Sequence, residues 1–429
     1  MNLFVFVAFV WRLGSVLYID LLGPLYSEQL NSNIGPGIAA VPIAVSQALV
    51  IAALLFSFRH SRLFKSAMTR PWSSLSLSWK KFSLSDFSFW LSSVFLLALF
   101  VELVARGPIP LFAGIERYDY TREYGGLLHH VLLKWEPMLT FQFGVFFTAP
   151  AFRGRPLDRR FGFLLVITLA YLFLVGHRFS AFYDSISFFL VPIGVLYLAR
   201  DLVHPGWNFV SRSSVARFWL AGAVISVLIL AAVFHSYTVV RGFSGSELFS
   251  KLSQRIFVQQ GEMWWPTYER VFLHGNWNRF DTLTRLLVNP FDPTRNSTMQ
   301  LLMERDLPLD RAHDILRYGS SYTGGWPEVF FEIGGPIGGF VLVVVGAILF
   351  SEFMFLLMRC ILEERLITCF FLTPVLYAVL LVIVSGMINS FVQTTFLIKL
   401  VLALVAYIAE DRWRAARLLS APSQGERIQ

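Results

Sequence analysis

Charged residues are scarce in this chain of 429 residues: Asp, Glu, Lys and Arg make up 15%, whereas hydrophobic residues make up 55%. Soluble domains carry about 25% charged residues. The chain therefore has too little charge to cover the surface of an ordinary soluble enzyme or to remain disordered. A polytopic membrane protein fits this composition, because spans of ~20 apolar residues would fill much of the sequence.

Cysteine and several catalytic signatures are also lacking. Cys360 and Cys369 lie in or beside apolar runs, so neither a disulfide framework nor a cysteine-based zinc site is indicated. The chain has no Walker-type Gly-x-x-x-x-Gly-Lys-Ser/Thr, no Gly-x-Ser-x-Gly, no His-Glu-x-x-His and no Asp-x-Asp pair. We therefore expect no nucleotide, no metal and no other cofactor.

Apolar runs of about the length of a membrane span recur along the chain. We predict an all-α polytopic fold with about ten transmembrane helices, and no internal repeat is visible. The predicted spans are residues 2–22, 37–58, 87–105, 131–150, 161–176, 183–199, 218–237, 329–358, 366–384 and 391–409. The N-terminus has no basic stretch or small-residue cleavage site, so we interpret it as a first span and not as a cleaved signal. The eighth span is long and is expected to bend at the Gly-Gly-Pro-Ile-Gly-Gly run from Gly334.

Lysine and arginine are distributed unequally between the two sets of loops. Loops 59–86, 151–160, 200–217, 359–365 and 410–429 hold 19 Lys and Arg, and the opposite short loops 23–36, 106–130, 176–182 and 385–390 hold four. The positive-inside rule then predicts that both termini are cytoplasmic. The same rule explains the net charge of +8, so no nucleic-acid partner is expected.

One long segment, residues 238–328, is predicted to lie outside the cytoplasm. It divides the chain into spans 1–237, this large loop, spans 329–409 and a basic tail 410–429. Long loops usually carry structure or function. Ser246 is expected to cap a helix from Glu247 to about Trp265 that ends at Pro266. Shorter helices are expected over 299–305, after Ser297, and from Asp310 to Gly319.

Polar residues gather at the outer ends of the predicted spans: Arg106, Lys134, Glu136, His177, Arg178, Asp184, Arg241, Glu328, Glu332, Asn389, Ser390 and Gln393. Basic residues outside the cytoplasm oppose the positive-inside tendency, and guanidinium groups match the paired oxygens of a phosphate. An anionic ligand is one explanation. The alternative is that these residues pair with each other, as Arg178 with Asp184 and Lys134 with Glu136, or extend to water.

The large loop carries candidates for catalysis and sugar binding. Glu328 at the membrane edge suits a general base, or alternatively a helix-capping carboxylate. His313 is a second candidate base, or alternatively an exposed helix residue. The tryptophans suit either a membrane interface or a surface that stacks on sugars; they are Trp264, Trp265, Trp277 and Trp326.

Five sequence segments together resemble the bacterial O-antigen or oligosaccharide repeat-unit polymerases (Wzy-type) and, more loosely, the O-antigen ligase superfamily. They are Arg106-Gly-Pro-Ile-Pro-Leu-Phe112, Gly176-His-Arg-Phe-Ser180, Arg241-Gly-Phe243, Gln254-Arg255 with Gln259-Gln260-Gly261, and the stretch from Ser321-Tyr-Thr-Gly-Gly-Trp-Pro-Glu to Gly339. The resemblance covers most of the chain as architecture and implies a GT-C-like arrangement with a partly helical external loop.

The resemblance implies transfer of a growing glycan from undecaprenyl diphosphate onto a new lipid-linked repeat unit. The reaction would take place at the periplasmic face of the bacterial inner membrane, among membrane lipids, with a chain-length regulator as a possible protein partner. The leaving group is already activated, which agrees with the missing nucleotide and metal motifs. Ligase-like transfer to another acceptor, or transport of the lipid-linked oligosaccharide, remains an alternative.

The resemblance also suggests roles for individual residues. The diphosphate-binding residues would be Arg178, Arg241 and Arg255. Substrate would be bound by Arg106, His177, Gln259, Glu262, Trp265 and Trp326. Catalysis would fall to Glu328, His313 and Tyr322. The ligase relatives often have a histidine just before the span, where this chain has Tyr322-Thr323, so the identity of the base stays open.

Overall fold

The computed structural model describes residues 2–69, 84–151, 155–177, 179–203, 227, 230–231, 234, 236–240, 242–277, 298–317, 325–363 and 365–420. These residues are almost entirely helical, which confirms the predicted all-α class, and β1 and β2 pair as one antiparallel hairpin. The elements are α1 Asn2–Leu22, β1 Leu25–Ser27, β2 Ser32–Ile34, α2 Ala40–His60, α3 Arg62–Thr69, α4 Leu84–Arg106, α5 Pro110–Ala113, α6 Arg117–Glu123, α7 Leu127–Thr148, α8 Arg159–Leu174, α9 Phe179–Val203, η3 Ser236–Val240, α11 Gly245–Phe257, α12 Trp264–Tyr268, η4 Glu269–Leu273, α14 Thr298–Asp306, α15 Leu309–Arg317, α16 Glu328–Leu362, α17 Leu366–Ser385, η5 Ile388–Val392 and α18 Thr394–Ser420.

Several of these helices have the length and composition of membrane spans. Among the described residues, five segments qualify: Ala40–His60, Leu84–Ala113, Ala181–Ala199, Glu328–Leu362 and Leu366–Val384. They coincide with the second, third, sixth, eighth and ninth predicted spans. The chain is thus an α-helical protein with several long apolar helices, as the composition predicted, whereas most of predicted span 218–237 lies outside the described residues.

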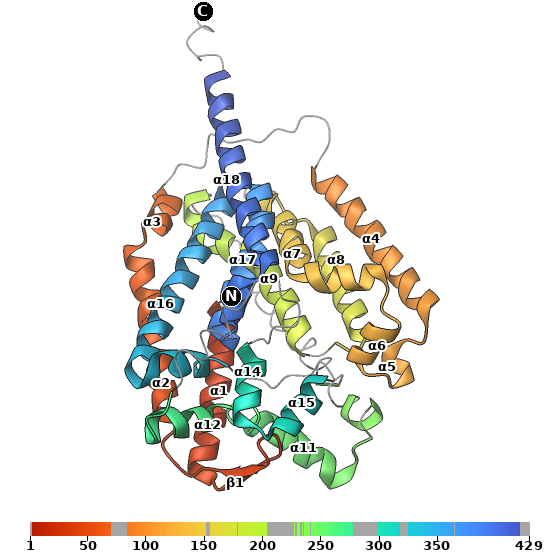
Figure 1. The fold of residues 1–429 in the computed structure, drawn as a ribbon. Coiled ribbons are helices and arrows are strands. Elements are labelled where there is room, and N and C mark those ends of the chain that lie inside the picture. The colour runs from red at the N-terminus through yellow and green to blue at the C-terminus, as the bar shows by residue number, and fades with distance from the viewer. Residues whose placement is uncertain are drawn as a thin grey trace, which may run out of the picture.

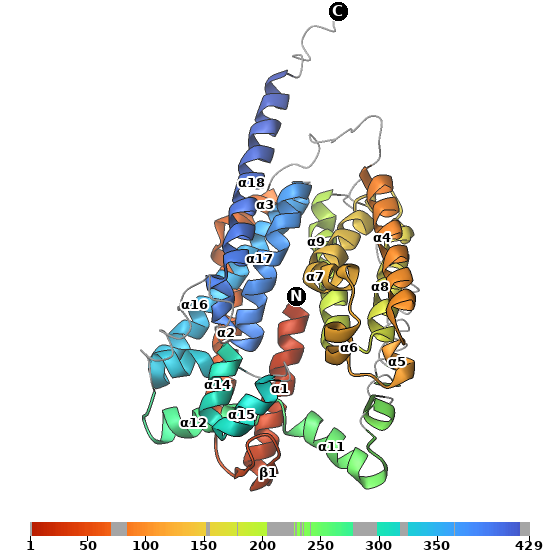
Figure 2. The same cartoon turned by 45° about the vertical axis from the view of Figure 1, so that its right-hand side comes forward.

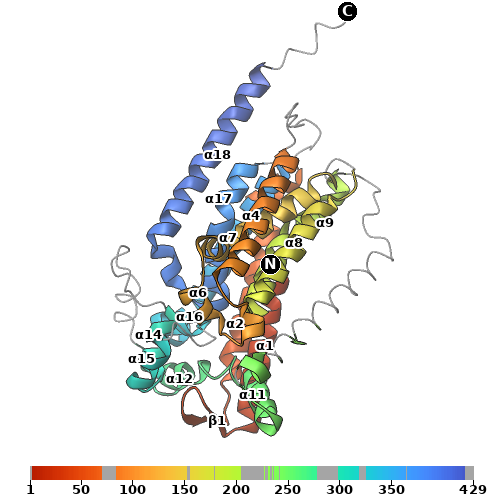
Figure 3. The same ribbon diagram turned by 90° about the vertical axis from the view of Figure 1, so that its right-hand side faces the viewer.

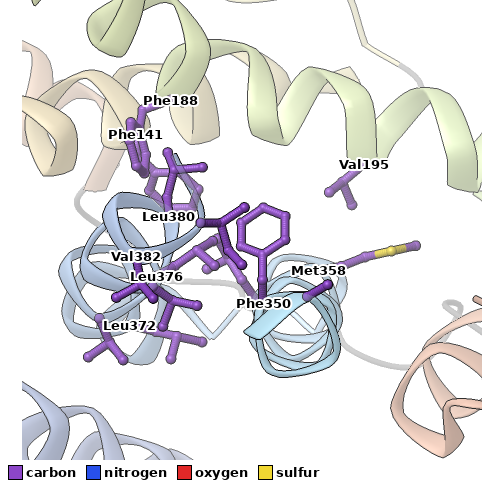
Figure 4. Packing of buried hydrophobic residues seen from close by; sticks show 14 of the residues in the cluster. Phe141, Phe188, Val195, Phe350, Met358, Leu372, Leu376, Leu380 and Val382 are labelled. Atoms are coloured by element: carbon purple, nitrogen blue, oxygen red, sulfur yellow. The ribbon is translucent and has the colours of Figure 1, made fainter. Parts of the chain in front are cut away.

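The long helices form two groups that meet along one face (Figure 2). In the first group α4, α7, α8 and α9 pack together, and in the second α2, α16, α17 and α18 do so. The groups touch where α17 packs on α7 and α16 packs on α9. Figure 4 shows the apolar packing at this contact, where Phe141 of α7 and Phe188 of α9 approach Leu380 of α17.

Helix α16 bends near its start, as its glycine run predicted. Gly335 has φ +69° and ψ −169° inside the helix. Residues other than glycine rarely adopt this backbone conformation. The bend separates a first part, which carries Glu328 and Glu332, from the long apolar remainder. It therefore turns these two carboxylates toward the elements of the large loop.

Those elements gather at one end of the bundle and form a unit that we call the cap (Figure 1): β1, β2, α11, α12, η4, α14 and α15. The cap shares one hydrophobic core with α1, α2 and the start of α16; its members include Val16, Ile43, Trp264, Met303 and Phe331. The predicted large loop is therefore packed onto the bundle, and the hairpin between α1 and α2 is part of the same unit.

Helix α1 has the bounds expected of the first span, Asn2–Leu22. It runs from about the middle of the bundle's height to the cap (Figures 1 and 2). At its far end, Asp20 accepts hydrogen bonds from the backbone N–H groups of Ala39 and Ala40, at 3.1 and 2.7 Å, and so caps α2. This contact joins the first two helices at the cap.

Two predictions for the large loop were wrong in detail. The helix expected from Glu247 to Trp265 ends at Phe257 and is followed by a turn, because Gly261 packs so closely on α1 that an added Cβ would lie 2.8 Å from Val16 Cγ2. Pro266 does not end a helix but lies in the first turn of α12, where the backbone N–H that proline lacks needs no partner within the helix. The helices expected near 299–305 and from Asp310 were confirmed as α14 and α15.

The end of the bundle opposite the cap carries the described parts of three predicted basic loops, 59–86, 359–365 and 410–429. Helix α3, the turn between α16 and α17 and the end of α18 all lie there (Figures 1 and 3). In that turn, Arg365 is buried, and it donates to Glu363 at 2.5 Å and to Asp411 at 2.8 Å. The described chain thus separates arginine-rich turns from the cap along the helix axes.

Candidate functional site

The described residues contain most, but not all, of the predicted site residues. Arg178, Arg241 and Tyr322 lie outside them. Many of the polar residues that the sequence singled out gather in three groups, whereas Arg255, His313 and Arg106 lie on or near helix surfaces. One group lies where the cap meets α1 and α16, which we call the cap junction; the second surrounds His177 beside α6 and α7; and the third lies between the two helix groups.

Glu328 is the centre of the cap junction. It begins α16, its side chain is completely buried, and its Oε1 accepts a hydrogen bond from Arg12 of α1. The second oxygen, Oε2, has no hydrogen-bond partner. The predicted general base is therefore paired with an arginine from the other end of the sequence, and one of its oxygens retains its capacity to accept a proton or a hydrogen bond.

Two more polar atoms close to this pair lack partners. They are Arg12 Nε and the indole Nε1 of Trp326, both buried. Trp326 is fully buried and stacks on Phe9 of α1 with ring centroids 4.2 Å apart. Its ring thus packs α16 onto α1, which leaves no face for a sugar; each unpaired buried polar atom costs ~1–3 kcal/mol.

Glu332, one turn further along α16, joins a second network that holds the cap. Its oxygens accept hydrogen bonds from Arg270 Nε at 3.0 Å, Arg305 Nη1 at 2.8 Å and Thr267 Oγ1 at 3.2 Å. Arg270 also lies 2.9 Å from Asp306. Burial raises the pKa of Asp306 to about 7, even though the arginine opposes that shift. Glu332 is thus held by two arginines from the cap, whereas both buried oxygens of Asp306 lack a hydrogen-bond partner among the described residues.

The other predicted binding residues of the cap have protein partners or are exposed. Glu262 is buried and accepts a hydrogen bond from Ser27 of β1 at 2.5 Å, and burial raises its pKa to about 7. Trp265 is buried and donates its indole N–H to Glu269 at 2.7 Å. Gln259 follows α11 and is partly buried. These contacts of Glu262 and Trp265 are therefore internal to the cap.

Three predicted residues lie on or near helix surfaces. Arg255 is partly buried on α11, His313 is exposed on α15, and Arg106 is exposed as the last residue of α4. The alternative interpretation of His313 as an exposed helix residue describes its position well.

His177 belongs to the second group. It follows α8 after a turn at Gly176, and its Nε2 is buried without a hydrogen-bond partner. Burial, with a smaller effect from the nearby cations Arg117 and His129, lowers the pKa of His177 to about 3. His177 is therefore neutral at physiological pH and suits hydrogen bonding better than it suits binding an anion by charge.

The third group surrounds a cavity of about 170 Å³ between the two helix groups, which we call the inter-bundle pocket. Its polar lining comprises Lys134 of α7, Tyr377 of α17, Ser390 of η5, Gln393 in the connection that follows, and Thr395 and Lys399 of α18. Within the described part of the chain, neither lysine makes an ion pair. Two lysines thus line one small cavity, Lys134 exposed and Lys399 half-buried, and no carboxylate among the described residues pairs with either.

Two carboxylates lie behind this pocket, and each uses a hydroxyl group as its partner. Glu136 accepts a hydrogen bond from Ser185 of α9, and the Tyr377 hydroxyl lies 3.5 Å from Asp184 Oδ2. The alternative interpretation, in which Lys134 pairs with Glu136, is therefore not met: no ion pair joins them among the residues that the structure describes. The sequence did place Lys134, Glu136, Asp184, Ser390 and Gln393 on one side of the membrane, and the structure brings them together.

Sequence reasoning missed three important residues: Arg12, Tyr377 and Lys399. Arg12 and Lys399 each interrupt an apolar helix with a charge, which is uncommon in spans and usually functional, so that signal could have identified both. Tyr377 carries no such signal, because aromatic residues are frequent throughout the chain. Its position beside Asp184 depends on the packing of α17 against α9.

Comparison with known proteins gives one match. Residues 292–400 match the model of a family of unknown function, DUF6418. No curated protein and no solved structure matches the chain. The matched segment contains Glu328, Glu332, Tyr377 and Lys399, but neither Arg12 nor Lys134.

Proposed function

We propose that the chain is a membrane-embedded glycosyltransferase that polymerises undecaprenyl-diphosphate-linked oligosaccharide repeat units. The growing glycan would pass from its lipid diphosphate to a hydroxyl group at the non-reducing end of a new lipid-linked repeat. The architecture would be the ten predicted spans with both termini in the cytoplasm and the cap in the periplasm. The separation of the arginine-rich turns from the cap supports this orientation.

The observation that carries the proposal is the Glu328–Arg12 pair at the cap junction. It supplies a carboxylate with one oxygen held by a guanidinium group and the other without a hydrogen-bond partner. An acceptor sugar needs such a group, because its hydroxyl must lose a proton as it attacks the anomeric carbon. Arg12 would fix the orientation of the carboxylate, as a pre-organised neighbour does in many active sites.

The chemistry balances without a cofactor. The hydroxyl oxygen of the acceptor forms a bond to the anomeric carbon of the donor, and the bond from that carbon to the diphosphate oxygen breaks. The proton of the hydroxyl passes to Glu328 Oε2, and undecaprenyl diphosphate leaves with the electron pair. The full burial of Glu328 would keep bulk water from competing as acceptor, and a movement of the cap junction would admit the sugar.

Reconstitution tests the proposal. Purified protein in liposomes would receive one lipid-linked repeat unit, without nucleotide and with a chelator, and the products would be separated by size. We expect a ladder of lipid-linked oligomers. Glu328→Gln keeps the shape and the hydrogen bond to Arg12 but removes the base, so we expect the rate of elongation to fall by a factor of 10²–10⁴.

A matched control is Glu304→Gln, which removes a carboxylate from the partly exposed surface of α14. This variant should form the ladder at the wild-type rate. Transfer only to an alternative acceptor such as lipid A–core would indicate a ligase. Movement of the substrate across the liposome membrane with no product would indicate a transporter and would refute the polymerase.

A further inference from the structure

The inter-bundle pocket lies outside the cap junction and has no role in the transfer step proposed above. It is formed near the cap-side ends of α7, α17 and α18, where η5 connects the last two helices. The elements that line it, α7, α17, η5 and α18, belong to the helix bundle. We therefore consider a ligand from the membrane or from its surface.

The pocket brings together the ammonium groups of Lys134 and Lys399, which can only donate. Ser390, Gln393 and Thr395 add hydroxyl and amide groups that can donate or accept, whereas the Tyr377 hydroxyl already donates to Asp184. The nearby carboxylates Glu136 and Asp184 are bonded to or face hydroxyl groups of Ser185 and Tyr377. Because an ammonium group in partly apolar surroundings is stabilised by a counter-ion, this arrangement suits an anion with several oxygens.

The surroundings of the pocket point to an amphiphilic anion. On α18, next to Lys399, the side chains of Ile398, Val401 and Val405 are exposed and apolar. A hydrocarbon tail can lie along this surface while its charged group occupies the pocket. Drug-sized ligands occupy ~300–1,000 Å³, so a cavity of about 170 Å³ accommodates a headgroup and not a complete oligosaccharide.

We infer that the inter-bundle pocket binds the phosphate or diphosphate headgroup of a membrane lipid through Lys134 and Lys399. The shared chemistry is a phosphoryl anion held by two ammonium groups, one from each helix group. The choice of an isoprenoid diphosphate as the lipid rests on the proposed function. The pocket would then hold lipid substrate or the released carrier lipid at the contact between the two helix groups.

Binding to the purified full-length chain in detergent tests the inference, for example by native mass spectrometry with defined lipids. The probes are undecaprenyl diphosphate, inorganic pyrophosphate and phosphatidylglycerol. The variants are Lys134→Gln, Lys399→Gln, the double variant, and the double replacement of both lysines by arginine. Lys65→Gln is the matched control, because this exposed lysine lies on α3 at the opposite end of the bundle.

We expect each single glutamine variant to bind undecaprenyl diphosphate about threefold to tenfold more weakly, and the double variant at least tenfold more weakly. The double arginine variant should recover most of the affinity, and Lys65→Gln should bind as the wild type does. Wild-type affinity in the double glutamine variant would overturn the inference. Equal affinity for inorganic pyrophosphate would overturn the assignment to a lipid, and equal affinity for phosphatidylglycerol would overturn the preference for a diphosphate.

The binding assay separates this inference from the proposed function because it requires no turnover. Lysine-dependent lipid binding without any polymer ladder would support the pocket and refute the polymerase. A ladder whose rate and lipid affinity are the same in the double glutamine variant would support the polymerase and refute the pocket.

Discussion

At the cap junction each arginine faces a carboxylate: Arg12 pairs with Glu328, and Arg270 and Arg305 pair with Glu332. In the inter-bundle pocket, by contrast, Lys134 and Lys399 face no carboxylate among the described residues. The difference indicates two uses of charge: the Arg12–Glu328 pair is buried, whereas at the pocket Lys134 is exposed and Lys399 is half-buried. Paired charges fix how the cap sits on the bundle, whereas unpaired cations that share a cavity are available to a ligand from outside the chain.

The strongest test of this comparison is to break the pair at the cap junction. Arg12→Met leaves the Glu328 carboxylate buried and without its cation, which should destabilise the fold by about 3–5 kcal/mol. The melting temperature in detergent and the yield of folded protein report this loss.

Replacing both members of the pair separates stability from function. The double variant Arg12→Met with Glu328→Met should recover most of the lost melting temperature, because two well-packed apolar side chains replace the ion pair. It should nevertheless form no polymer ladder. Recovery of the ladder together with stability would show that the pair is only structural.

A smaller effect on stability is expected at Glu332, whose carboxylate pairs with two arginines of the cap. Glu332→Gln keeps the volume and one hydrogen bond but leaves Arg270 and Arg305 with less charge to neutralise them, so stability should fall by ~2–3 kcal/mol. Limited proteolysis would monitor release of the cap.

Lys134→Gln is the variant to compare with Glu332→Gln in the stability measurement. It removes a cation that has no protein partner, so the melting temperature in the absence of added lipid should stay within about 2 °C of the wild type. A loss as large as that of Glu332→Gln would mean that Lys134 stabilises the fold and would contradict the distinction between the two regions.

A further expected effect on stability concerns pH and Glu262. Burial raises the pKa of Glu262 in the fold from 4.5 to about 7, so the folded chain binds this proton more tightly than the unfolded chain. The resulting stability is fully present below about pH 4.5 and is lost as the pH rises through 7.

Glu262→Gln should therefore be more stable than the wild type at pH 8, by about 1–3 kcal/mol, and equally stable at pH 5. Melting temperatures measured across this range provide the check. Asp306, whose pKa burial also raises to about 7, preserves part of the pH dependence in the variant. An unchanged slope would assign the whole pH dependence to other groups.

Much of the helical architecture could be predicted from hydropathy, because a run such as Leu366–Val384 has no other stable form in a membrane. The bend at Gly335 was also predictable, since consecutive glycines and a proline interrupt a helix. The end of α11 at Phe257 was not, because a contact of Gly261 with Val16, far away in sequence, decides it.

The candidate site shows the same limit. Sequence placed Glu328 at the start of α16, and its candidate role as a base followed from that position and from the resemblance. Its partner Arg12 could not be predicted from the sequence, because no local rule connects residues separated by most of the chain. The assignment of tryptophans to a sugar surface was wrong for Trp326, whose ring fills the space between α1 and α16.

The sequence by itself determined that this chain is helical, rich in membrane-length apolar segments, and divided into basic turns and one long polar loop. These properties follow from composition and from local periodicity, which depend on neighbouring residues. Only the tertiary structure decided which charged side chains pair with each other and which remain available to a ligand. The pairing depends on how α1 packs on α16 and how α7 packs against α17 and α18, and these contacts are set by the packing of the whole molecule.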